Sequence, residues 1–302
     1  MTRVALIGYG AVAAIHAREL AAAGATLAAV CGPDEAKARA FAEAHGCGCA
    51  VSDLRAACEK AEVAVVASPS ALHCEQALEA LKCGLPVLVE LPACASPEEA
   101  RRLGAASAKA KLALQCAHTA RYAEPYRRLG KWIAEGRLGE IVQVNYFRSI
   151  QLKTRSWIDD ALLHHTSHPV DLLLHWFGSV RPCGAAAWPR VGPASEASIL
   201  AQLPSGGPAT VAVSYTASLP ASRMTVVGSL HTAVTDGFSF LDSDESGASW
   251  RGDPKTVYEK AVGEQDREFL GCCRDGRGAI AWSETTQLVD FLAKAVTLCK
   301  ST

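Results

Sequence analysis

The sequence lacks any apolar run that approaches the ~20 residues of a membrane-spanning helix. It also lacks a large net charge of either sign, because 30 lysines and arginines nearly balance 31 aspartates and glutamates and leave a net charge of −1. Proteins that bind nucleic acid by neutralising phosphates carry a basic excess, so this balance argues against that class. The first residues lead directly into an expected strand without a signal-peptide pattern, so we expect a cytoplasmic protein with no membrane partner.

Cysteine pairs with the C-x-x-C spacing of a structural zinc site are also absent. The twelve cysteines include only a C-x-C at Cys47 and Cys49 and an adjacent pair at Cys272 and Cys273. In a chain of this length without a secretion signal, such residues are typical of reduced, buried thiols. We therefore expect neither a disulfide framework nor a metal site.

What the sequence does contain is enough apolar residues, 49% of 302, to bury the cores of two domains. In residues 1–120, short apolar runs alternate with helical runs, which predicts a doubly wound α/β domain with a parallel sheet covered on both faces. In residues 121–302 a helix precedes several strands and two helices close the chain, which predicts an α+β domain on a mostly antiparallel, open sheet. The elements expected there are helices over 125–135, 158–177, 257–273 and 284–299, and strands over 141–147, 199–203, 210–215, 223–227 and 231–235.

A glycine-rich segment stands at the first expected strand-to-helix turn. The residues from Gly8 to Ala13 read G-Y-G-A-V-A, which fits the G-x-G-x-x-G/A dinucleotide fingerprint. Gly8 permits the tight turn, and Gly10 lets the backbone approach a pyrophosphate. The free backbone N–H groups of Ala11 and Val12, at the start of the helix, would then face the anion. The alternative is a tight turn with a structural role only; we interpret the segment as a dinucleotide site.

The end of the second expected strand bears on the choice between NAD and NADP. A carboxylate at that position hydrogen-bonds the ribose hydroxyls and repels a 2′-phosphate. Here the chain reads C-G-P-D from Cys31 to Asp34, so the carboxylate comes late, and Gly32 leaves room for a phosphate. No arginine is obviously placed to hold that phosphate. We expect Gly32 and Asp34 to lie near the ribose and NADP to be the cofactor, with NAD as the alternative.

Several segments, in this order and spacing, resemble the Gfo/Idh/MocA family of NAD(P)-dependent dehydrogenases. They are G-x-G-x-x-A-x-x-H over 8–16, S-P-S-A-L-H over 68–73, V-E-L-P over 89–92, R-Y at 121–122, E-G-R-L-G over 135–139 and D-R-E-F over 266–269. The resemblance implies a Rossmann domain followed by a domain with an open sheet. The outer face of that sheet commonly forms an oligomer interface, so we expect a homodimer or homotetramer. It also implies that Ser68, Pro69, His73 and Glu90 lie near the cofactor.

Two positions depart from the family pattern. Leu91 stands where members usually carry a lysine that polarises the reacting oxygen, and His164 stands where they carry an aspartate four residues before the catalytic histidine. His168 matches that histidine, and the resemblance therefore implies that it is the base. His164 and His168 share a face of the expected helix, with His165 displaced by about 100°. His164 and His165 are expected to orient their neighbour or to touch substrate.

A narrower resemblance accounts for both departures. The segments R-S-W-I-D over 155–159, H-H-x-x-H over 164–168 and Q-D-R-E-F over 265–269 resemble one branch of the family. Members of that branch use NADP to oxidise the cyclic hemiacetal of a carboxylated aromatic ring-cleavage product to a lactone. A hemiacetal hydroxyl is more acidic than an ordinary alcohol, and the ring oxygen donates into the carbon that loses hydride. A neutral histidine base can therefore act without a lysine.

Cations near the histidines would suit a carboxylated substrate. Arg148, Lys153 and Arg155 flank the loop before them, and arginine can bind a carboxylate through two hydrogen bonds. The alternative for these residues is ordinary surface charge. Arg121 and Trp157 complete the expected substrate contacts. The alternative for Arg121 is a structural contact that holds the two domains together. Asp171 could fix the tautomer of a histidine or cap a helix.

The sequence leaves two further functions open. One is a sugar, inositol or cis-dihydrodiol dehydrogenase of the same family, which the missing lysine disfavours. The other is a catalytically inactive dinucleotide-binding regulator, against which the retained His168 and Asp171 argue.

Overall fold

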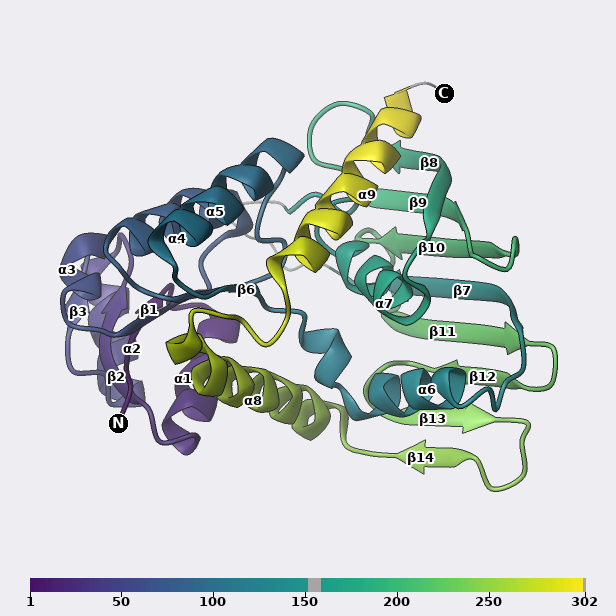
Figure 1. Cartoon of the computed structure of the whole chain (residues 1–302), viewed down its shortest axis with the longest axis horizontal. Coiled ribbons are helices and arrows are strands. Elements are labelled where there is room, and N and C mark those ends of the chain that lie inside the picture. Colours follow the sequence, from purple (N-terminus) through teal and green to yellow (C-terminus); the bar gives the residue numbers. More distant parts are fainter. Residues whose placement is uncertain (152–158, 301–302) are drawn as a thin grey trace. The chain divides into compact units, whose positions relative to one another are not determined.

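The computed structural model describes residues 1–151 and 159–300, which form two compact units (Figure 1). The first unit comprises Met1–His118 and Val262–Val289, and the second comprises Thr119–Ala261 and Asp290–Thr302. This division differs from the single boundary expected near residue 120, because residues 262–289 belong with the first unit. We describe each unit by itself.

The first unit is built on a six-stranded parallel sheet with the strand order β3-β2-β1-β4-β5-β6, which is the order of doubly wound dinucleotide-binding domains. The expected α/β class is thus confirmed. Strands β1 and β4 are buried almost throughout, because helices cover a parallel sheet on both faces. The strands are β1 (Arg3–Ile7), β2 (Thr26–Cys31), β3 (Ala50–Val51), β4 (Val63–Val66), β5 (Val87–Val89) and β6 (Leu114–Cys116). The helices that alternate with them are α1 (Ala11–Ala22), α2 (Glu35–His45), α3 (Leu54–Cys58), η1 (Ser70–Leu72), α4 (His73–Lys82) and α5 (Pro97–Ala110).

Residues from late in the sequence complete the core of this unit. Helix α8 (Pro254–Cys272) is followed by η3 (Cys273–Asp275) and α9 (Trp282–Lys300). Phe269 and Cys273 are buried in the same cluster as the β1 and β4 side chains. The Trp282 Nε1–H donates to the Ala100 carbonyl at 2.9 Å. The apolar face of α8 therefore packs on the parallel sheet, which explains why residues 262–289 do not belong to the second unit.

The second unit is built on an eight-stranded sheet with the order β14-β13-β12-β11-β7-β10-β9-β8. All neighbours pair antiparallel except β7 and β10, which run parallel, so the mostly antiparallel sheet is confirmed. Strands β8, β13 and β14 were not expected, because β13 and β14 are very short and β8 is a half-buried run of small residues. The strands are β7 (Ile141–Ser149), β8 (Arg181–Trp188), β9 (Glu196–Gln202), β10 (Pro208–Ser214), β11 (Ala221–Gly228), β12 (Thr232–Thr235), β13 (Phe240–Ser243) and β14 (Ser249–Arg251). The helical segments are η2 (Thr119–Tyr122), α6 (Glu124–Ala134) and α7 (Ser167–Phe177), and α6 packs on β12 and β13 (Figure 1).

The histidine-bearing helix is shorter than expected. Helix α7 begins only at Ser167, and residues 161–166 form turns rather than the start of a helix over 158–177. The Asp160 carboxylate accepts hydrogen bonds from the backbone N–H groups of Leu162 and Leu163, which holds the chain in a turn. Pro169 has no N–H to continue an earlier helix, and it fits the first turn of α7.

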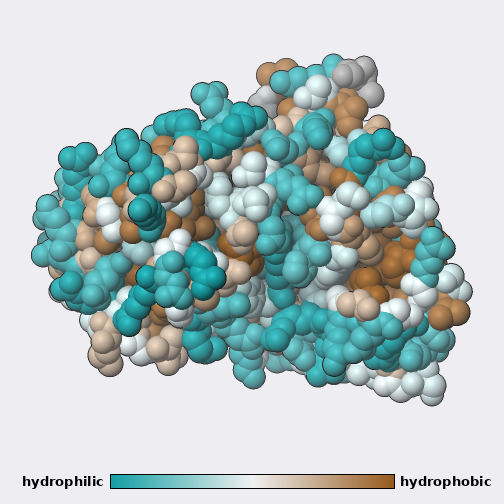
Figure 2. All heavy atoms as spheres, viewed as in Figure 1, coloured by the Kyte–Doolittle hydropathy of each residue, from teal (hydrophilic) through white to brown (hydrophobic). Residues whose placement is uncertain are grey.

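The second sheet leaves apolar side chains exposed on the face away from its core. Tyr146 and Ile199 point into the core, whereas their neighbours Phe147 and Leu200 are both 46% exposed. On the face of the molecule shown in Figure 2, hydrophobic residues also gather over the second unit, at the right of the view. Among the described residues, no helix combines the length and apolarity needed to span a membrane.

Candidate active site

The glycine segment forms a cradle that suits a pyrophosphate. Gly8 has φ +118°, and a Cβ there would lie 2.4 Å from the Ala67 carbonyl oxygen, so only glycine fits. Gly10 directly precedes α1, and nothing lies within 4 Å of the position that its Cβ would occupy. Among the described residues, no side chain caps the first turn of α1, where Ala11 and Val12 begin the helix. The open space and the uncapped amides fit the diphosphate of a dinucleotide.

The space at Gly32 is used differently from what the sequence suggests. A Cβ at Gly32 would lie 2.0 Å from Tyr9 Cε1, so the glycine makes room for the Tyr9 ring and not for a phosphate. The Tyr9 hydroxyl accepts a hydrogen bond from the Asp34 backbone N–H at 3.2 Å. The Asp34 carboxylate caps α2 through the Lys37 backbone N–H at 3.1 Å and lies 3.1 Å from Lys37 Nζ. The first carboxylate after β2 is therefore already engaged.

The ends of β4 and β5 bring four expected cofactor residues to one edge of the sheet. Ser68 and Pro69 follow β4, and Glu90 follows β5, with its backbone N–H bonded to the Val66 carbonyl. The buried His73 ring lies between the Ser68 carbonyl oxygen at 2.8 Å and the Pro92 carbonyl oxygen at 2.9 Å. Dinucleotides bind outside the carboxyl ends of such strands, so this edge is the expected cofactor edge.

His16 joins Glu90 to Asp266, a residue of the D-R-E-F segment to which the sequence assigns no role. The fully buried ring of His16 lies 2.8 Å from Asp266 Oδ2 through Nδ1 and 2.9 Å from Glu90 Oε1 through Nε2. Burial opposes a charge on this ring, but attraction by Asp266 and hydrogen bonds to both carboxylates outweigh it and raise the pKa of His16 to about 10. The ring is therefore an imidazolium at neutral pH and donates to both carboxylates. We call His16, Glu90 and Asp266 the buried ionic triad.

The apolar periodicity of α8 gives a sequence signal for the burial of Asp266. Val262, Asp266, Phe269 and Cys273 follow the i, i+4, i+7, i+11 spacing of one helix face, and the other three are apolar and buried. A carboxylate on the apolar stripe of a helix requires a buried partner. The sequence cannot say which residue that partner is.

His164, His165 and His168 lie together, and of these three only His168 belongs to α7. The ring centroids of His164 and His165 are 4.5 Å apart, and each lies 6.2 Å from the His168 ring. His164 and His165 come from the preceding turn, so a shared helix face is not what brings them together. His164 Nδ1 lies 3.9 Å from Asp159 Oδ2. In residues 1–151 and 159–300, no three His, Cys, Asp or Glu side chains are grouped to hold a metal ion.

Tyr215 joins this cluster from the end of β10. Its hydroxyl lies 2.5 Å from His165 Nδ1, and its buried ring meets the His165 ring edge-on at a centroid distance of 5.1 Å. No motif in the sequence points to Tyr215, because the contact depends on strand register and on the turn before α7.

Arg148 lies beside Tyr215 because β7 and β10 pair in parallel. Val213 is the partner of Arg148 in that register, and Tyr215 follows two residues later on the same face. Burial raises the pKa of Tyr215, Asp159 and Asp160 add to the increase, and the positive charge of Arg148 acts against it. Among the residues that the structure describes, the half-buried Arg148 guanidinium has no hydrogen-bond or ion-pair partner. A half-buried cation in this situation is suited to bind an anion.

Arg121 has a partner inside its own unit. Its guanidinium binds the Asp171 carboxylate through two hydrogen bonds, of 2.9 Å from Nε and 2.6 Å from a terminal nitrogen. The Arg121 and Asp171 side chains are 7% and 2% exposed, which makes this a buried, bidentate ion pair. The geometry therefore favours a structural role for both. Lys153, Arg155 and Trp157 lie outside the described residues.

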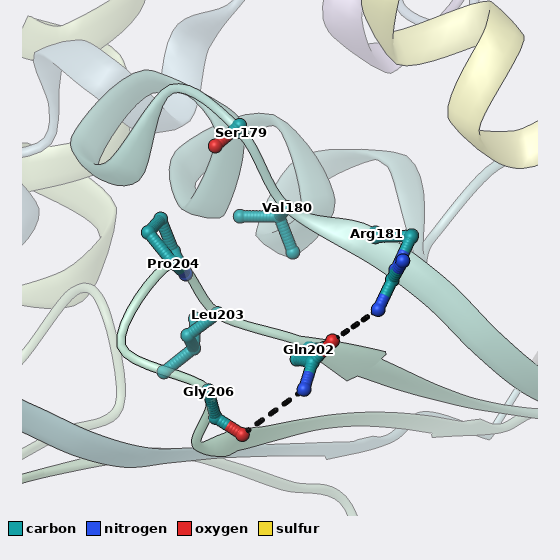
Figure 3. A pocket seen from close by; sticks show the side chains of 7 residues that line it. All are labelled: Ser179, Val180, Arg181, Gln202, Leu203, Pro204 and Gly206. Atoms are coloured by element: carbon teal, nitrogen blue, oxygen red, sulfur yellow. Dashed lines mark hydrogen bonds between the residues drawn. The ribbon is translucent and has the colours of Figure 1, made fainter.

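A separate depression of about 380 Å³ lies where β8 and β9 meet the loop that follows β9 (Figure 3). Two of its polar side chains face each other, because Arg181 donates to Gln202, which in turn donates to the Gly206 carbonyl. The depression shares no residue with the cofactor edge or the histidine cluster. It is lined by Ser179, Val180, Arg181, Gln202, Leu203, Pro204 and Gly206.

Comparison with known proteins finds a family model that matches part of each unit. Residues 2–118 match the family model described as "Oxidoreductase family, NAD-binding Rossmann fold", and residues 126–234 match "GFO/IDH/MocA C-terminal domain". The chain is 26% identical over 293 residues to a 4-carboxy-2-hydroxymuconate-6-semialdehyde dehydrogenase of Sphingobium sp., and the match covers 91% of each chain. It is 28% identical to an inositol 2-dehydrogenase of Arthrobacter sp., over 59% of this chain and 53% of that one. The WlbA dehydrogenase of Bordetella pertussis, solved with NADH and UDP-GlcNAcA, shares the fold with a TM-score of 0.86 at 20% identity, covering 99% of this chain and 96% of that one.

The glycine cradle predicts that Gly10→Val abolishes dinucleotide binding while the fold survives. A valine side chain would enter the open space in front of α1 without meeting any protein atom within 4 Å at its Cβ. Wild type should bind NADP(H) with a Kd in the roughly micromolar range and NAD(H) more weakly, measured by fluorescence titration. Gly8→Ala is the contrasting variant, because its Cβ meets backbone and should lower the free energy of unfolding. Unchanged dinucleotide binding in Gly10→Val would disprove the hypothesis that the glycine cradle holds the diphosphate.

The buried ionic triad predicts a pH-dependent stability. Because the pKa of His16 is raised from 6.5 to about 10 on folding, its contribution is complete below pH 6.5 and is lost as the pH rises toward 10. Asp266→Asn removes one partner of a buried charge and should lower the free energy of unfolding by about 3–5 kcal/mol at pH 7. It should also flatten the decline between pH 7 and pH 10, measured by urea unfolding. Glu75→Gln, which breaks an exposed ion pair with Arg102, is the control and should change neither quantity. Equal pH profiles for wild type and Asp266→Asn would contradict a charged His16.

Proposed function

The chain belongs to the Gfo/Idh/MocA family of NAD(P)-dependent dehydrogenases that act on CH–OH groups, and from this premise we propose that it oxidises a carboxylated cyclic hemiacetal to a lactone. The substrate we infer is an aromatic ring-cleavage product of the 4-carboxy-2-hydroxymuconate-6-semialdehyde type. The comparisons give no support to an inactive regulator. A sugar, inositol or cis-dihydrodiol substrate is the alternative against which the proposal is tested.

The cofactor we infer is NADP, which when bound accepts the hydride. Three observations support this choice over NAD. The strand β2 ends in Cys31 and Gly32 without a carboxylate. The Asp34 carboxylate is engaged by the α2 N-terminus and Lys37, so it is not free to select ribose hydroxyls. Lys37 is also a cation close to the strand end, where a 2′-phosphate would need one.

The residues that handle the proton are those of the histidine cluster. In the proposed reaction the hemiacetal O–H and C–H bonds break and a C=O bond forms, with the proton passing to the His168 imidazole and the hydride to the nicotinamide. His168 lies in the first turn of α7, with the rings of His164 and His165 6.2 Å away. Leu91 supplies no cation, and a hemiacetal requires none because its ring oxygen stabilises the carbon that loses hydride.

The inference that the substrate carries a carboxylate rests on the position of Arg148. Its guanidinium is half-buried, lies beside Tyr215 and has no hydrogen-bond or ion-pair partner among the described residues. Tyr215 is in turn bonded to His165. A substrate carboxylate would supply the missing countercharge close to the histidine cluster, and a bidentate pair would orient the ring for attack by the base.

The test is turnover of a carboxylated lactol, followed by nicotinamide absorbance, against glucose and myo-inositol. We expect efficient turnover of the lactol only. Arg148→Ala should lower kcat/KM for it by well over tenfold, mostly through KM, because losing one partner of a desolvated pair costs about 2–5 kcal/mol. His168→Ala should lower kcat by roughly 10²–10⁴-fold with little change in cofactor binding. The matched control is Arg181→Ala, which removes an arginine that bonds Gln202 in the same unit and should leave kcat/KM unchanged. Efficient turnover of a neutral polyol, together with an unchanged kcat/KM in Arg148→Ala, would refute the carboxylated substrate and favour a sugar or inositol dehydrogenase.

We also infer that copies of the chain associate through the outer face of the eight-stranded sheet, as a homodimer or homotetramer. The exposed Phe147 and Leu200 lie on that face, and such apolar residues favour association. Wild type should sediment at two or four times the 31.8 kDa chain mass. Phe147→Asp combined with Leu200→Asp should shift it toward the monomer while the far-UV circular dichroism stays unchanged. Sedimentation of wild type at the monomer mass would exclude this interface.

A further inference from the structure

Tyr215 and His165 form a pair that the proposed reaction leaves without a role. Tyr215 is 5% exposed, and its hydroxyl meets His165 Nδ1 at 2.5 Å. Both residues belong to the second unit, one from the end of β10 and the other from the turn before α7. The groups that face this pair are Arg148, Asp159, Asp160 and the rings of His164 and His168.

The direction of the hydrogen bond between them follows from counting donors and acceptors. The His165 backbone N–H faces the Tyr215 oxygen and acts to lower the pKa of its hydroxyl. Among the residues described by the structure, His165 Nδ1 is the one acceptor within reach of the Tyr215 hydroxyl proton. If Nδ1 carried a proton and donated instead, the buried hydroxyl proton would have no acceptor, and buried polar groups are rarely left so. The hydroxyl therefore donates to Nδ1.

The tyrosine also keeps its proton under assay conditions. Burial raises the pKa of the Tyr215 hydroxyl, and the nearby carboxylates of Asp159 and Asp160 raise it further. The donor is thus present throughout the pH range in which a histidine base operates.

We propose that Tyr215 is a positioning residue that holds His165 as the tautomer with its proton on Nε2, so that His165 serves the substrate as a hydrogen-bond donor and not as the base. A neutral imidazole that accepts at Nδ1 must carry its proton on Nε2. It cannot take up a substrate proton at Nε2, and Nδ1 is engaged by the tyrosine. This inference rests on the proposed function and sharpens it, because it removes His165 from the candidate bases and leaves the proton to His168.

The donor role has a chemical reason in this chain. As the hemiacetal loses its O–H proton to His168 and its hydride to the nicotinamide, negative charge develops on the oxygen that becomes the carbonyl. A fixed N–H donor stabilises such charge, as a lysine does in members that carry one at the position of Leu91. His165 would do so without adding a positive charge to a site that already has Arg148 for the carboxylate.

The first test needs neither substrate nor activity. Long-range ¹H–¹⁵N spectra of ¹⁵N-labelled wild type distinguish a protonated from an unprotonated ring nitrogen, and the signals that vanish in His165→Gln identify His165. We expect Nε2 protonated and Nδ1 unprotonated in wild type, and a mixture of tautomers in Tyr215→Phe. A proton on Nδ1 in wild type, or an unchanged His165 spectrum in Tyr215→Phe, overturns the proposal even if the enzyme proves to be the lactol dehydrogenase.

The second test is a double-mutant cycle on the carboxylated lactol. A glutamine amide can donate from a position close to that of Nε2 and has no tautomers, so His165→Gln should retain more turnover than His165→Ala. Tyr215→Phe alone should lower kcat by about tenfold or more, with KM little changed, because an orienting residue acts through the tautomer that it fixes. In the His165→Gln background, Tyr215→Phe should have no further effect. A loss of the same size in both backgrounds would show that Tyr215 acts by packing alone and would overturn the proposal.

Discussion

The first unit depends on one buried charge, the imidazolium of His16. It comes from α1, Glu90 comes from the end of β5 and Asp266 comes from α8, so three segments that are distant in sequence meet at one ring. Without a cation, the fully buried Asp266 carboxylate would have lost its hydration, and it would repel the partly buried Glu90 carboxylate. With the proton in place, both ring nitrogens donate and each carboxylate has its partner. The ring therefore determines which residue of α8 faces the sheet.

The same charge sets the geometry of the cofactor edge. Helix α1 begins directly after the glycine cradle, and Glu90 directly precedes the buried Leu91. Because His16 bonds Glu90 from within α1, the helix that begins at the glycine cradle and the end of β5 at the expected cofactor edge cannot shift independently. The late residues 262–289 belong with the first unit for the same reason, since Asp266 and Phe269 are both buried against it.

Local pattern was enough to predict the glycine cradle and the parallel sheet with its longer helices, but not the short β3 and α3, because the former follow from periodicity and from residues adjacent in sequence. It failed where long-range contacts decide the outcome. The contact of His16 with Asp266 spans 250 residues, and the contact of His165 with Tyr215 spans 50. The helix that carries His168 was predicted too long, because the Asp160 turn outweighs the helical propensity of the following residues. Gly32 was interpreted as empty space because the sequence does not reveal that Tyr9 folds over it.

The departures of this chain from its family are physically consistent with one another. A lysine at position 91 would serve a secondary alcohol, whose oxygen must be stabilised as it loses its proton. With Leu91 there, the hemiacetal that we propose would supply part of that stabilisation through its ring oxygen, and the His165 donor would supply the rest. The carboxylated substrate that we propose would bring its own negative charge close to Arg148, which lies on the inner face of β7 beside Tyr215. A second cation would compete for that carboxylate and allow the substrate to bind in more than one orientation. Under the proposal of a carboxylated hemiacetal, a neutral donor such as His165 would stabilise the reacting oxygen without creating this ambiguity, and Leu91 and the histidine cluster would then suit the same substrate chemistry.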